Sequence, residues 1–238
     1  MANNSFKFKQ FEVKQNLAAM KVGTDGVLLG AWVPIIDSGY CLDIGTGTGL
    51  LSLMVAQRTE YTQIVAIDID EDANKQSSLN FSNSKWSDRL VSYHTSLNKF
   101  MKSTENKFDT IVCNPPFFLS GNSAPNKQRA VARHSFSLPL DELLVGVTKL
   151  LKPNGLFSLI LPKESYEIFT VAAKDIGLFE RKRLEVRPAP NKSVHRVISC
   201  WSFIYQKREI EELIIETGGR HIYSEEYKEL TKDFYLNF

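Results

Sequence analysis

Cysteine is scarce in this sequence of 238 residues. No two of the three cysteines have the C-x-x-C spacing of a zinc site or a redox-active pair: they are Cys41, Cys113 and Cys200. Each lies in an apolar, strand-like stretch, which is typical of buried free thiols in a reducing compartment. The sequence therefore predicts a cytoplasmic protein with no disulfide framework and no metal site.

Long apolar segments are also absent. The N-terminal sequence MANNSFKFKQ lacks the apolar core of a signal peptide, and no stretch approaches the roughly 18 apolar residues of a membrane span. There is no internal repeat and no low-complexity tract. These absences predict a globular protein without a membrane partner.

A large excess of charge of either sign is missing as well. Lys and Arg number 29 and Asp and Glu 27, which gives a net charge of +2, and 43% of the residues are hydrophobic. This is ordinary globular composition, so disordered, collagen-like and coiled-coil chains are excluded. A chain of this length buries about 70% of its unfolded surface and needs no disulfide or metal for stability.

Short apolar strands alternate with helical segments through the middle of the chain. Strands are expected at 40–44, 63–68, 90–94, 108–114 and 155–162, and helices at 50–57, 71–83, 138–151 and 164–176. This alternation predicts an α/β fold, with helices on both faces of a parallel sheet. Two more apolar runs, 181–187 and 196–206, are separated only by a loop, so we expect them to pair antiparallel at the edge of the sheet.

We expect one domain over residues 1–238. Its core at 36–206 follows an N-terminal extension at 1–35 and precedes an acidic tail at 207–238. Helical and frayed structure fit the tail equally well.

A glycine-rich turn follows the first strand of the alternation: Leu42-Asp43-Ile44-Gly45-Thr46-Gly47-Thr48-Gly49. Glycines let the backbone turn tightly and approach a ligand closely. The G-x-G-x-G spacing differs from the G-x-G-x-x-G of nicotinamide sites. Asp43 would repel a pyrophosphate but suits a ligand with an ammonium group, and S-adenosyl-L-methionine (AdoMet) carries an ammonium and a sulfonium.

A second acid, Asp68, ends the next predicted strand, 19 positions after Gly49. A carboxylate at this place can accept hydrogen bonds from both hydroxyls of a ribose. Together, Asp43 and Asp68 favour AdoMet over a nicotinamide nucleotide as the cofactor. The alternative is that both acids only end turns or cap helices.

The tetrapeptide Asn114-Pro115-Pro116-Phe117 ends the fourth predicted strand. An exocyclic aromatic amine is a weak nucleophile because its lone pair is delocalised into the ring. The Asn114 side-chain oxygen and the Pro115 carbonyl are two acceptors that can take the amine hydrogens and free the lone pair. The prolines stiffen the backbone, and Phe117 can stack on a flat substrate. The alternative is a rigid turn with a core phenylalanine.

These motifs resemble those of class I AdoMet-dependent methyltransferases of the Asn-Pro-Pro-aromatic group. Further stretches are similar to the bacterial tRNA1(Val) (adenine(37)-N6)-methyltransferase family: Phe6-Lys7-Phe8-Lys9-Gln10-Phe11, Met20-Lys21-Val22-Gly23-Thr24-Asp25-Gly26-Val27-Leu28-Leu29-Gly30-Ala31-Trp32 and Arg129-x-x-x-Arg133-His134. The resemblance implies a Rossmann-like fold with a mostly parallel seven-stranded sheet and an antiparallel C-terminal edge hairpin. It also implies methyl transfer from AdoMet to the N6 amine of an adenine in tRNA.

The resemblance assigns roles to individual residues. The amino acid part of the cofactor would be held by Asp43, Gly45, Thr46, Gly47 and Gly49, its ribose by Asp68, and its methionine end by a strand and turn at 21–25 that includes Thr24 and Asp25. Ser96 or a backbone group would have to replace the acid that relatives often carry for the cofactor adenine. The target base would be held by Asn114, Pro115 and Phe117. From the residues alone, Thr24 or Asp25 fits equally well as the N-cap of a helix that begins at Gly26.

Basic residues gather in two polar loops, 120–134 and 187–196, which we expect near the site. Phosphate contacts from such loops would position a tRNA partner. The candidates are Lys127, Arg129, Arg133, His134, Lys192 and Arg196. The alternative is that these charges are merely solvated. The oligomeric state is open, with a monomer as the expectation.

Two other functions fit the same fold. A guanine-N2 or protein-glutamine methyltransferase shares the Asn-Pro-Pro-aromatic motif, and a non-catalytic AdoMet- or RNA-binding module shares the glycine loop. A protein substrate would require a helical N-terminal domain and a DNA substrate a target-recognition domain, neither of which we expect here. The intact tetrapeptide favours an enzyme over a binding module.

Overall fold

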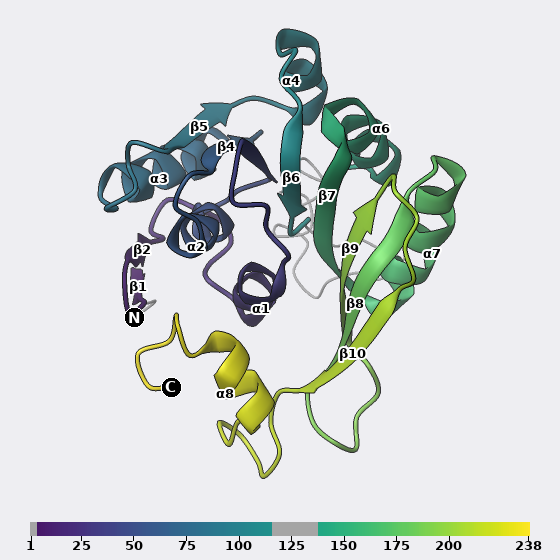
Figure 1. Cartoon of the computed structure of the whole chain (residues 1–238). Helices are drawn as coiled ribbons and strands as arrows, with labels where there is room; N and C mark the ends of the chain where they lie inside the picture. The colour runs from purple at the N-terminus through teal and green to yellow at the C-terminus, as the bar shows by residue number, and fades with distance from the viewer. Residues whose placement is uncertain (1–3, 116–137) are drawn as a thin grey trace, which may run out of the picture.

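An eight-stranded sheet forms the centre of the protein in the computed structural model, which describes residues 4–115 and 138–238 (Figure 1). From one edge to the other the strands are β10 (Glu209–Ile214), β8 (Phe179–Arg187), β9 (Arg196–Ser202), β7 (Leu151–Pro162), β6 (Phe108–Cys113), β3 (Tyr40–Ile44), β4 (Gln63–Asp68) and β5 (Leu90–His94). Neighbouring strands are parallel except where β9 meets β7 and β8. The predicted α/β fold with a mostly parallel sheet is therefore confirmed.

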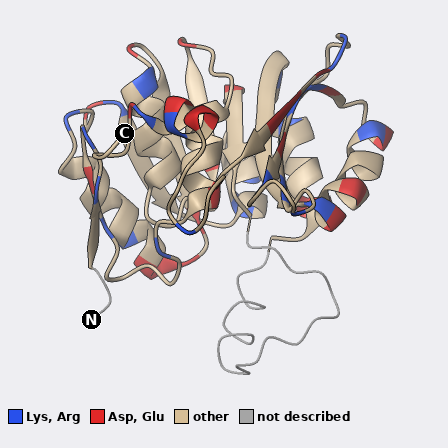
Figure 2. Cartoon of the chain, turned by 90° about the horizontal axis from the view of Figure 1, so that it is seen from below, with Lys and Arg blue, Asp and Glu red and all other residues tan. Residues whose placement is uncertain are grey.

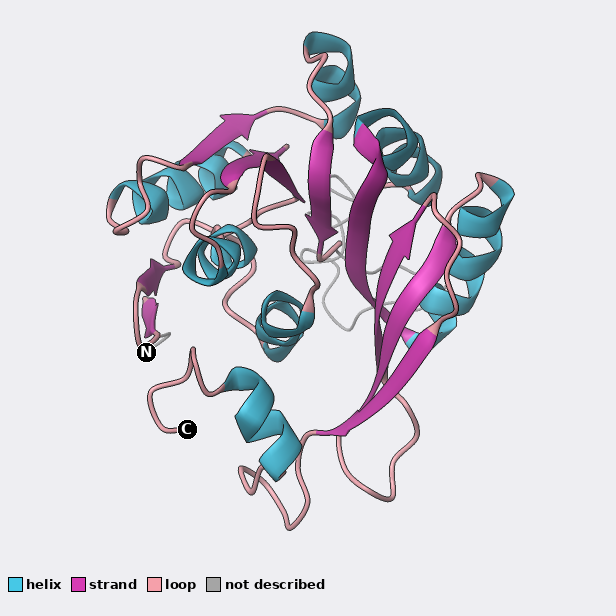
Figure 3. Ribbon diagram, viewed as in Figure 1, coloured by secondary structure: helices cyan, strands magenta, loops and turns pink. Residues whose placement is uncertain are grey.

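Helices cover both faces of this sheet (Figure 3). One face carries α1 (Thr24–Trp32), α2 (Leu50–Arg58) and α3 (Glu71–Ser82), with α8 (Glu225–Thr231) beside α1, and the other face carries α4 (Leu97–Ser103), α6 (Leu140–Leu150) and α7 (Lys163–Asp175). Successive strand residues point to opposite faces, so Cys41 belongs to the first core and Leu42 to the second. Burial on both sides explains why these strands are continuously apolar.

The three cysteines lie in β3, β6 and β9 and are buried free thiols, as predicted. Among the helices in the described ranges, none is long and apolar enough to cross a membrane.

The predicted and observed boundaries of the strands agree best where turn residues frame a short apolar run. β3, β4 and β5 have the predicted bounds. In contrast, β7 begins at Leu151 rather than at residue 155, because Pro153-Asn154-Gly155 forms a bulge inside the strand instead of a turn before it. Phe108 of β6 pairs with Leu151, and Thr110 pairs with Leu156 across the bulge.

The β10 edge differs from the predicted antiparallel hairpin of a seven-stranded sheet. β8 and β9 do pair antiparallel, but β10 adds an eighth strand outside β8 and runs parallel to it. Part of the expected acidic tail is therefore an edge strand. Its acids pair with bases of β8, as Lys182–Glu211 at 2.9 Å and Arg187–Glu212 at 3.6 Å. Figure 2 shows acidic and basic residues side by side on these strands.

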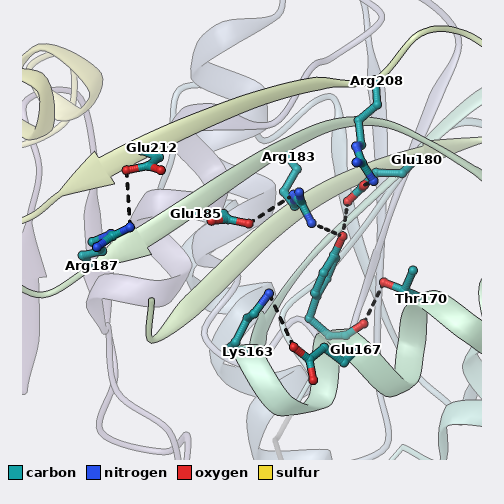
Figure 4. A network of polar contacts seen from close by, with 10 residues as sticks. Lys163, Glu167, Thr170, Glu180, Arg183, Glu185, Arg187, Arg208 and Glu212 are labelled. Carbon is teal, nitrogen blue, oxygen red and sulfur yellow. Dashed lines mark hydrogen bonds and ion pairs between the residues drawn. The ribbon is translucent and has the colours of Figure 1, made fainter. Parts of the chain in front are cut away.

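A polar network joins β8 to α7 at the same edge (Figure 4). The Tyr166 hydroxyl donates to Glu180 at 2.6 Å and accepts from Arg183 at 3.0 Å, while Arg208 binds the other oxygen of Glu180 at 2.9 Å. Arg183 also lies 3.5 Å from Glu185. Each charged residue of this network thus lies beside a partner of opposite charge.

The two ends of the chain pack together (Figure 1). The N-terminal hairpin consists of β1 (Ser5–Lys7) and β2 (Glu12–Lys14). Lys9 N–H donates to the Phe234 carbonyl at 2.8 Å, and the Phe8 and Tyr235 rings stack with centroids 6.0 Å apart. The N-terminal extension and the C-terminal tail therefore share one apolar core with α1 and α2.

Candidate active site

The glycine loop joins β3 to α2 and is held against β4. Gly45 and Thr46 N–H both donate to the Ile67 carbonyl, at 2.9 and 3.1 Å. Gly45, Gly47 and Gly49 have φ of 70°, 57° and 83°, a left-handed conformation that glycine adopts at little cost.

These glycines serve two purposes. A Cβ added at Gly45 or Gly47 would meet no atom within 4 Å, whereas one at Gly49 would stand 2.5 Å from the Phe81 ring of α3. Gly49 is therefore needed for packing as well as for its backbone conformation. Gly45 and Gly47 leave open space at the carboxyl end of β3, where α/β sheets bind ligands.

Asp43 lies fully buried at the base of this loop. Its Oδ2 accepts hydrogen bonds from the Thr46 and Ser52 hydroxyls, each at 2.7 Å, but its Oδ1 has no partner among the described residues. Burial raises the pKa of this carboxyl to about 6, and the hydrogen bonds lower it only in part. An uncompensated buried acceptor is the group that a cationic ligand would satisfy. The hydroxyl of Thr46, a residue predicted to hold the amino acid part of the cofactor, donates its hydrogen to Asp43 in this structure.

Asp68 connects the glycine loop to the turn after β4. Its Oδ2 accepts from Gly47 N–H at 2.8 Å and its Oδ1 from Asp70 N–H at 2.9 Å. Burial raises the pKa of Asp68. Because each carboxylate oxygen has a second lone pair, both can still accept from a ligand.

Asn114 and Pro115 follow β6, and β6 pairs in parallel with β3 so that Cys113 lies opposite Ile44. The asparagine and the glycine loop therefore leave adjacent strands at the same edge of the sheet, the topological switch point of this fold. Asn114 is half-buried and Pro115 buried. A Cβ at Gly26 of α1 would stand 3.7 Å from the Asn114 Nδ2, so α1 closes one side of this edge.

Helix α1 begins at Thr24, two residues before the predicted start, and Gly23 is its N-cap. No side chain caps the helix, so the expectation that Thr24 or Asp25 is the N-cap is wrong, as is the strand-and-turn over 21–25. Thr24 and Asp25 face a cleft on the flank of α1 away from Gly26. The Asp25 carboxylate accepts from Arg196 Nε at 2.8 Å.

Ser96 follows β5 and caps α4, where its hydroxyl oxygen accepts from Lys99 N–H at 3.3 Å. The structure gives it this capping role. Its contact with the cofactor adenine stays a prediction.

The predicted RNA-binding residues divide into three groups. Arg196 is paired with Asp25, and Lys192 is exposed in the β8–β9 loop. The remaining candidates lie outside the described residues, together with the proposed stacking ring: Lys127, Arg129, Arg133, His134 and Phe117. Because Lys182, Arg183 and Arg187 pair with acids, the local basic excess of β8 is largely offset within the fold.

Two residues that the sequence reasoning missed hold the site together. Ser52 of α2 donates its hydroxyl hydrogen to Asp43. Asn80 of α3 donates through Nδ2 to the carbonyls of Thr48 and Lys14, both at 2.8 Å, and so ties the glycine loop to the N-terminal extension. A polar side chain among the inward-facing apolar residues of a predicted helix is the signal that would have found both.

Comparison with known proteins agrees with this geometry. A family model described as the methyltransferase small domain matches residues 20–137. The structure of a predicted O-methyltransferase from Agrobacterium tumefaciens has a TM-score of 0.68 at 16% identity, over 88% of this chain and 96% of that one. A ribosomal protein L11 methylase from Lactobacillus delbrueckii subsp. bulgaricus has a TM-score of 0.56 at 16% identity, over 80% and 83%. Fold and glycine loop thus define a class I methyltransferase, an enzyme class that uses AdoMet.

Full-length relatives define the family more narrowly. Proteins named tRNA1(Val) (adenine(37)-N6)-methyltransferase are 47% identical in Flavobacterium psychrophilum, over 97% of this chain and 99% of the relative, and 45% identical in Phocaeicola vulgatus, over 100% of both. The relative of that name from Vibrio vulnificus is 42% identical over 99% and 97%. The chain belongs to the tRNA1(Val) (adenine(37)-N6)-methyltransferase family.

Proposed function

We propose that this protein transfers a methyl group from AdoMet to the exocyclic N6 of adenine 37 in tRNA1(Val). The observation that carries this proposal is that Asn114-Pro115 leaves β6 beside the glycine loop of β3, in a chain whose full-length relatives bear this activity in their names. The three buried free thiols support action in the reducing cytoplasm.

The residues at the β3 and β4 ends fit AdoMet. Gly45 and Gly47 leave room for its amino acid part, and the unpaired Oδ1 of Asp43 offers charge to its ammonium group. Asp68 would hold the ribose hydroxyls. The bound cofactor supplies an electrophilic methyl group on a sulfonium.

Asn114 and Pro115 would prepare the amine for attack. The side-chain oxygen of Asn114 and the main-chain carbonyl of Pro115 accept the two amine hydrogens, which draws the nitrogen lone pair out of the ring. Pro115 is buried, its ring fixes its φ, and the proline that follows it restricts its ψ, so its carbonyl has little freedom to turn. No strong general base is needed, because the proton becomes acidic only after transfer.

The adenine has to leave its stack to reach this site, as in other enzymes that act on a base. Phe117 would stack on the extruded base.

Nucleoside analysis tests the proposal. Purified protein is incubated with methyl-labelled AdoMet and total tRNA from a strain that lacks the modification, and the RNA is digested to nucleosides. Label in N6-methyladenosine is the expected result. Label confined to N2-methylguanosine, or found only in protein, would overturn the proposed function.

A further inference from the structure

A cleft of about 440 Å³ opens beside the first turn of α1. Four parts of the chain enclose it: α1, the adjoining ends of β8 and β9, the loop that follows β10, and α8. Leu28, Val186 and Ile215 provide its apolar lining. We call it the C-terminal cleft, because much of its wall belongs to the segment after β10.

A second hollow of about 480 Å³ adjoins the C-terminal cleft and runs along the β8–β9 loop. Glu216 and Arg220 line both spaces, so the two form a continuous surface.

The polar lining of the cleft is rich in cationic and aromatic groups. Arg196 and Arg220 face it, with His195, His221 and Tyr223. Of its two acids, Asp25 is paired with Arg196, and Glu216 accepts from the backbone N–H of His221 at 2.8 Å. The side chain of Arg220 is exposed and has no hydrogen-bond or ion-pair partner in the described ranges. Two arginines and two acids line the cleft, so its formal charges balance, and Arg220 is the cation that no carboxylate contacts in the described ranges.

The turn that carries Arg220 and His221 is firmly built. Thr217 N–H donates to the Ile222 carbonyl at 2.9 Å, and Ile222 N–H donates to the Gly219 carbonyl at 3.1 Å. His221 has a φ of 68°, and its Nδ1 lies 3.2 Å from the Tyr223 hydroxyl. Histidine adopts this left-handed region more readily than most non-glycine residues.

The cleft and the proposed target site lie at the same edge of the sheet, on opposite flanks of α1. Arg196 in the cleft wall pairs with Pro162 at the carboxyl end of β7, and β7 runs parallel to β6, the strand that Asn114 follows. A polynucleotide whose target base reaches Asn114 has to carry its neighbouring nucleotides past the start of α1, and the C-terminal cleft lies on the other flank of that helix.

We propose that the C-terminal cleft binds the nucleotides that flank the target adenine, with Arg220 and His221 on a backbone phosphate. This inference rests on the proposed function, since it takes the polynucleotide to be the tRNA substrate. The unpaired Arg220, the histidines in the lining and the adjoining second hollow fit a phosphate of a single RNA strand. The β8 bases beside it cannot supply the same attraction, because acids of β10 occupy them.

The test compares three forms of the full-length chain. The double variant Arg220→Ala/His221→Asn removes both polar groups, and asparagine tolerates the left-handed backbone at 221. Lys174→Ala, on α7 at the opposite face of the sheet, removes one positive charge as a matched control. Affinity for tRNA is measured across a series of salt concentrations, AdoMet affinity is measured by calorimetry, and thermal melting checks folding.

The double variant should bind tRNA roughly three- to tenfold more weakly, and the slope of log affinity against log salt should fall by about one. Its AdoMet affinity and its turnover at saturating tRNA should match those of the Lys174→Ala control. Unchanged tRNA affinity and salt slope, in a protein that binds and methylates tRNA, would overturn the cleft assignment alone. Polyglutamate serves as a probe for an acidic protein partner: a double variant that loses polyglutamate binding but keeps tRNA binding would also overturn the assignment.

The wild-type chain separates the two proposals. Binding of tRNA that weakens in the double variant, without any methylation by the wild type, would support the cleft and refute the proposed function. Failure of the wild type to bind tRNA at all would refute both.

Discussion

Charged side chains have different surroundings at the carboxyl ends of β3 and β4 and at the β8–β10 edge of the same sheet. At the carboxyl ends of β3 and β4, Asp43 is fully buried with one oxygen unpartnered within the described residues, and burial raises the pKa of both Asp43 and Asp68. At the β8–β10 edge, acids and bases are paired across strands or to α7, although the Nε atoms of Arg183 and Arg187 are buried without a hydrogen-bond partner in the described ranges. A buried carboxylate oxygen without a partner is costly, and a cationic ligand at Asp43 would offset that cost. The paired charges at the β8–β10 edge have a structural role.

The largest expected effect concerns Asn114. Asn114→Ala removes one of two acceptors for the amine hydrogens, so turnover should fall by about 100-fold or more, as when one preorganised polar group is deleted from an active site. AdoMet affinity, measured by calorimetry, should stay unchanged, because the glycine loop lies on another strand. Loss of cofactor affinity together with turnover would contradict the role given to Asn114.

A matched glycine pair tests whether the glycine loop serves a ligand. Gly45 and Gly177 both have positive φ, both are exposed, and neither would bring a Cβ within 4 Å of another atom. Alanine at either position should destabilise the fold by a similar amount, about 1–2 kcal/mol from backbone strain, measured by denaturant unfolding. Only Gly45→Ala should weaken AdoMet binding, by about tenfold or more. Equal AdoMet affinities in the two variants would show that the glycine loop is not part of the cofactor site.

The raised pKa of Asp43 predicts a pH dependence. Its folded pKa of about 6 lies above the ordinary value of 3.8, so the folded state binds the proton more tightly than the unfolded chain does. The free enzyme should therefore lose stability as pH rises from about 4 to 6, by up to about 3 kcal/mol from this group. Urea unfolding at several pH values should show a flatter profile for Asp43→Asn.

Cofactor binding should have the opposite pH dependence, because an ammonium group favours the ionised carboxylate. AdoMet affinity should rise by about tenfold between pH 5 and pH 7. Asp68, also buried, contributes in the same direction, so the difference between wild type and Asp43→Asn isolates Asp43. The same rise in both proteins would show that Asp43 does not face the cofactor.

The smallest effect concerns the Asp25–Arg196 ion pair. It is partly exposed, so a double-mutant cycle with Asp25→Asn and Arg196→Gln should give a coupling of about 0.5–1 kcal/mol in unfolding free energy. If Arg196 acts only by holding α1, both single variants should affect tRNA binding alike. If the slope of log tRNA affinity against log salt falls in Arg196→Gln but not in Asp25→Asn, the predicted contact of Arg196 with a phosphate would be supported.

The same comparison explains which strands, helices and site residues could be predicted from the sequence. β3, β4 and β5 were predictable because each is a short apolar run framed by turn residues. The kind of ligand at the glycine loop was predictable because Asp43 stands just before the loop in sequence. α4 was missed because its seven residues bury only Leu97, Phe100 and Met101. β10 was missed because its acids resemble a solvated tail, and the β8 bases that pair with them lie far upstream. The Asp25–Arg196 pair spans 171 positions, which no local pattern encodes.

The central claim is that the edge formed by the β3 and β6 ends methylates one adenine of one tRNA. The most direct measurement uses two tRNA1(Val) transcripts, one with adenine 37 and one with guanine at that position, incubated with the purified protein and labelled AdoMet. The account predicts label as N6-methyladenosine in the first transcript and none in the second. Equal labelling of both transcripts, or no labelling of the first, would contradict it.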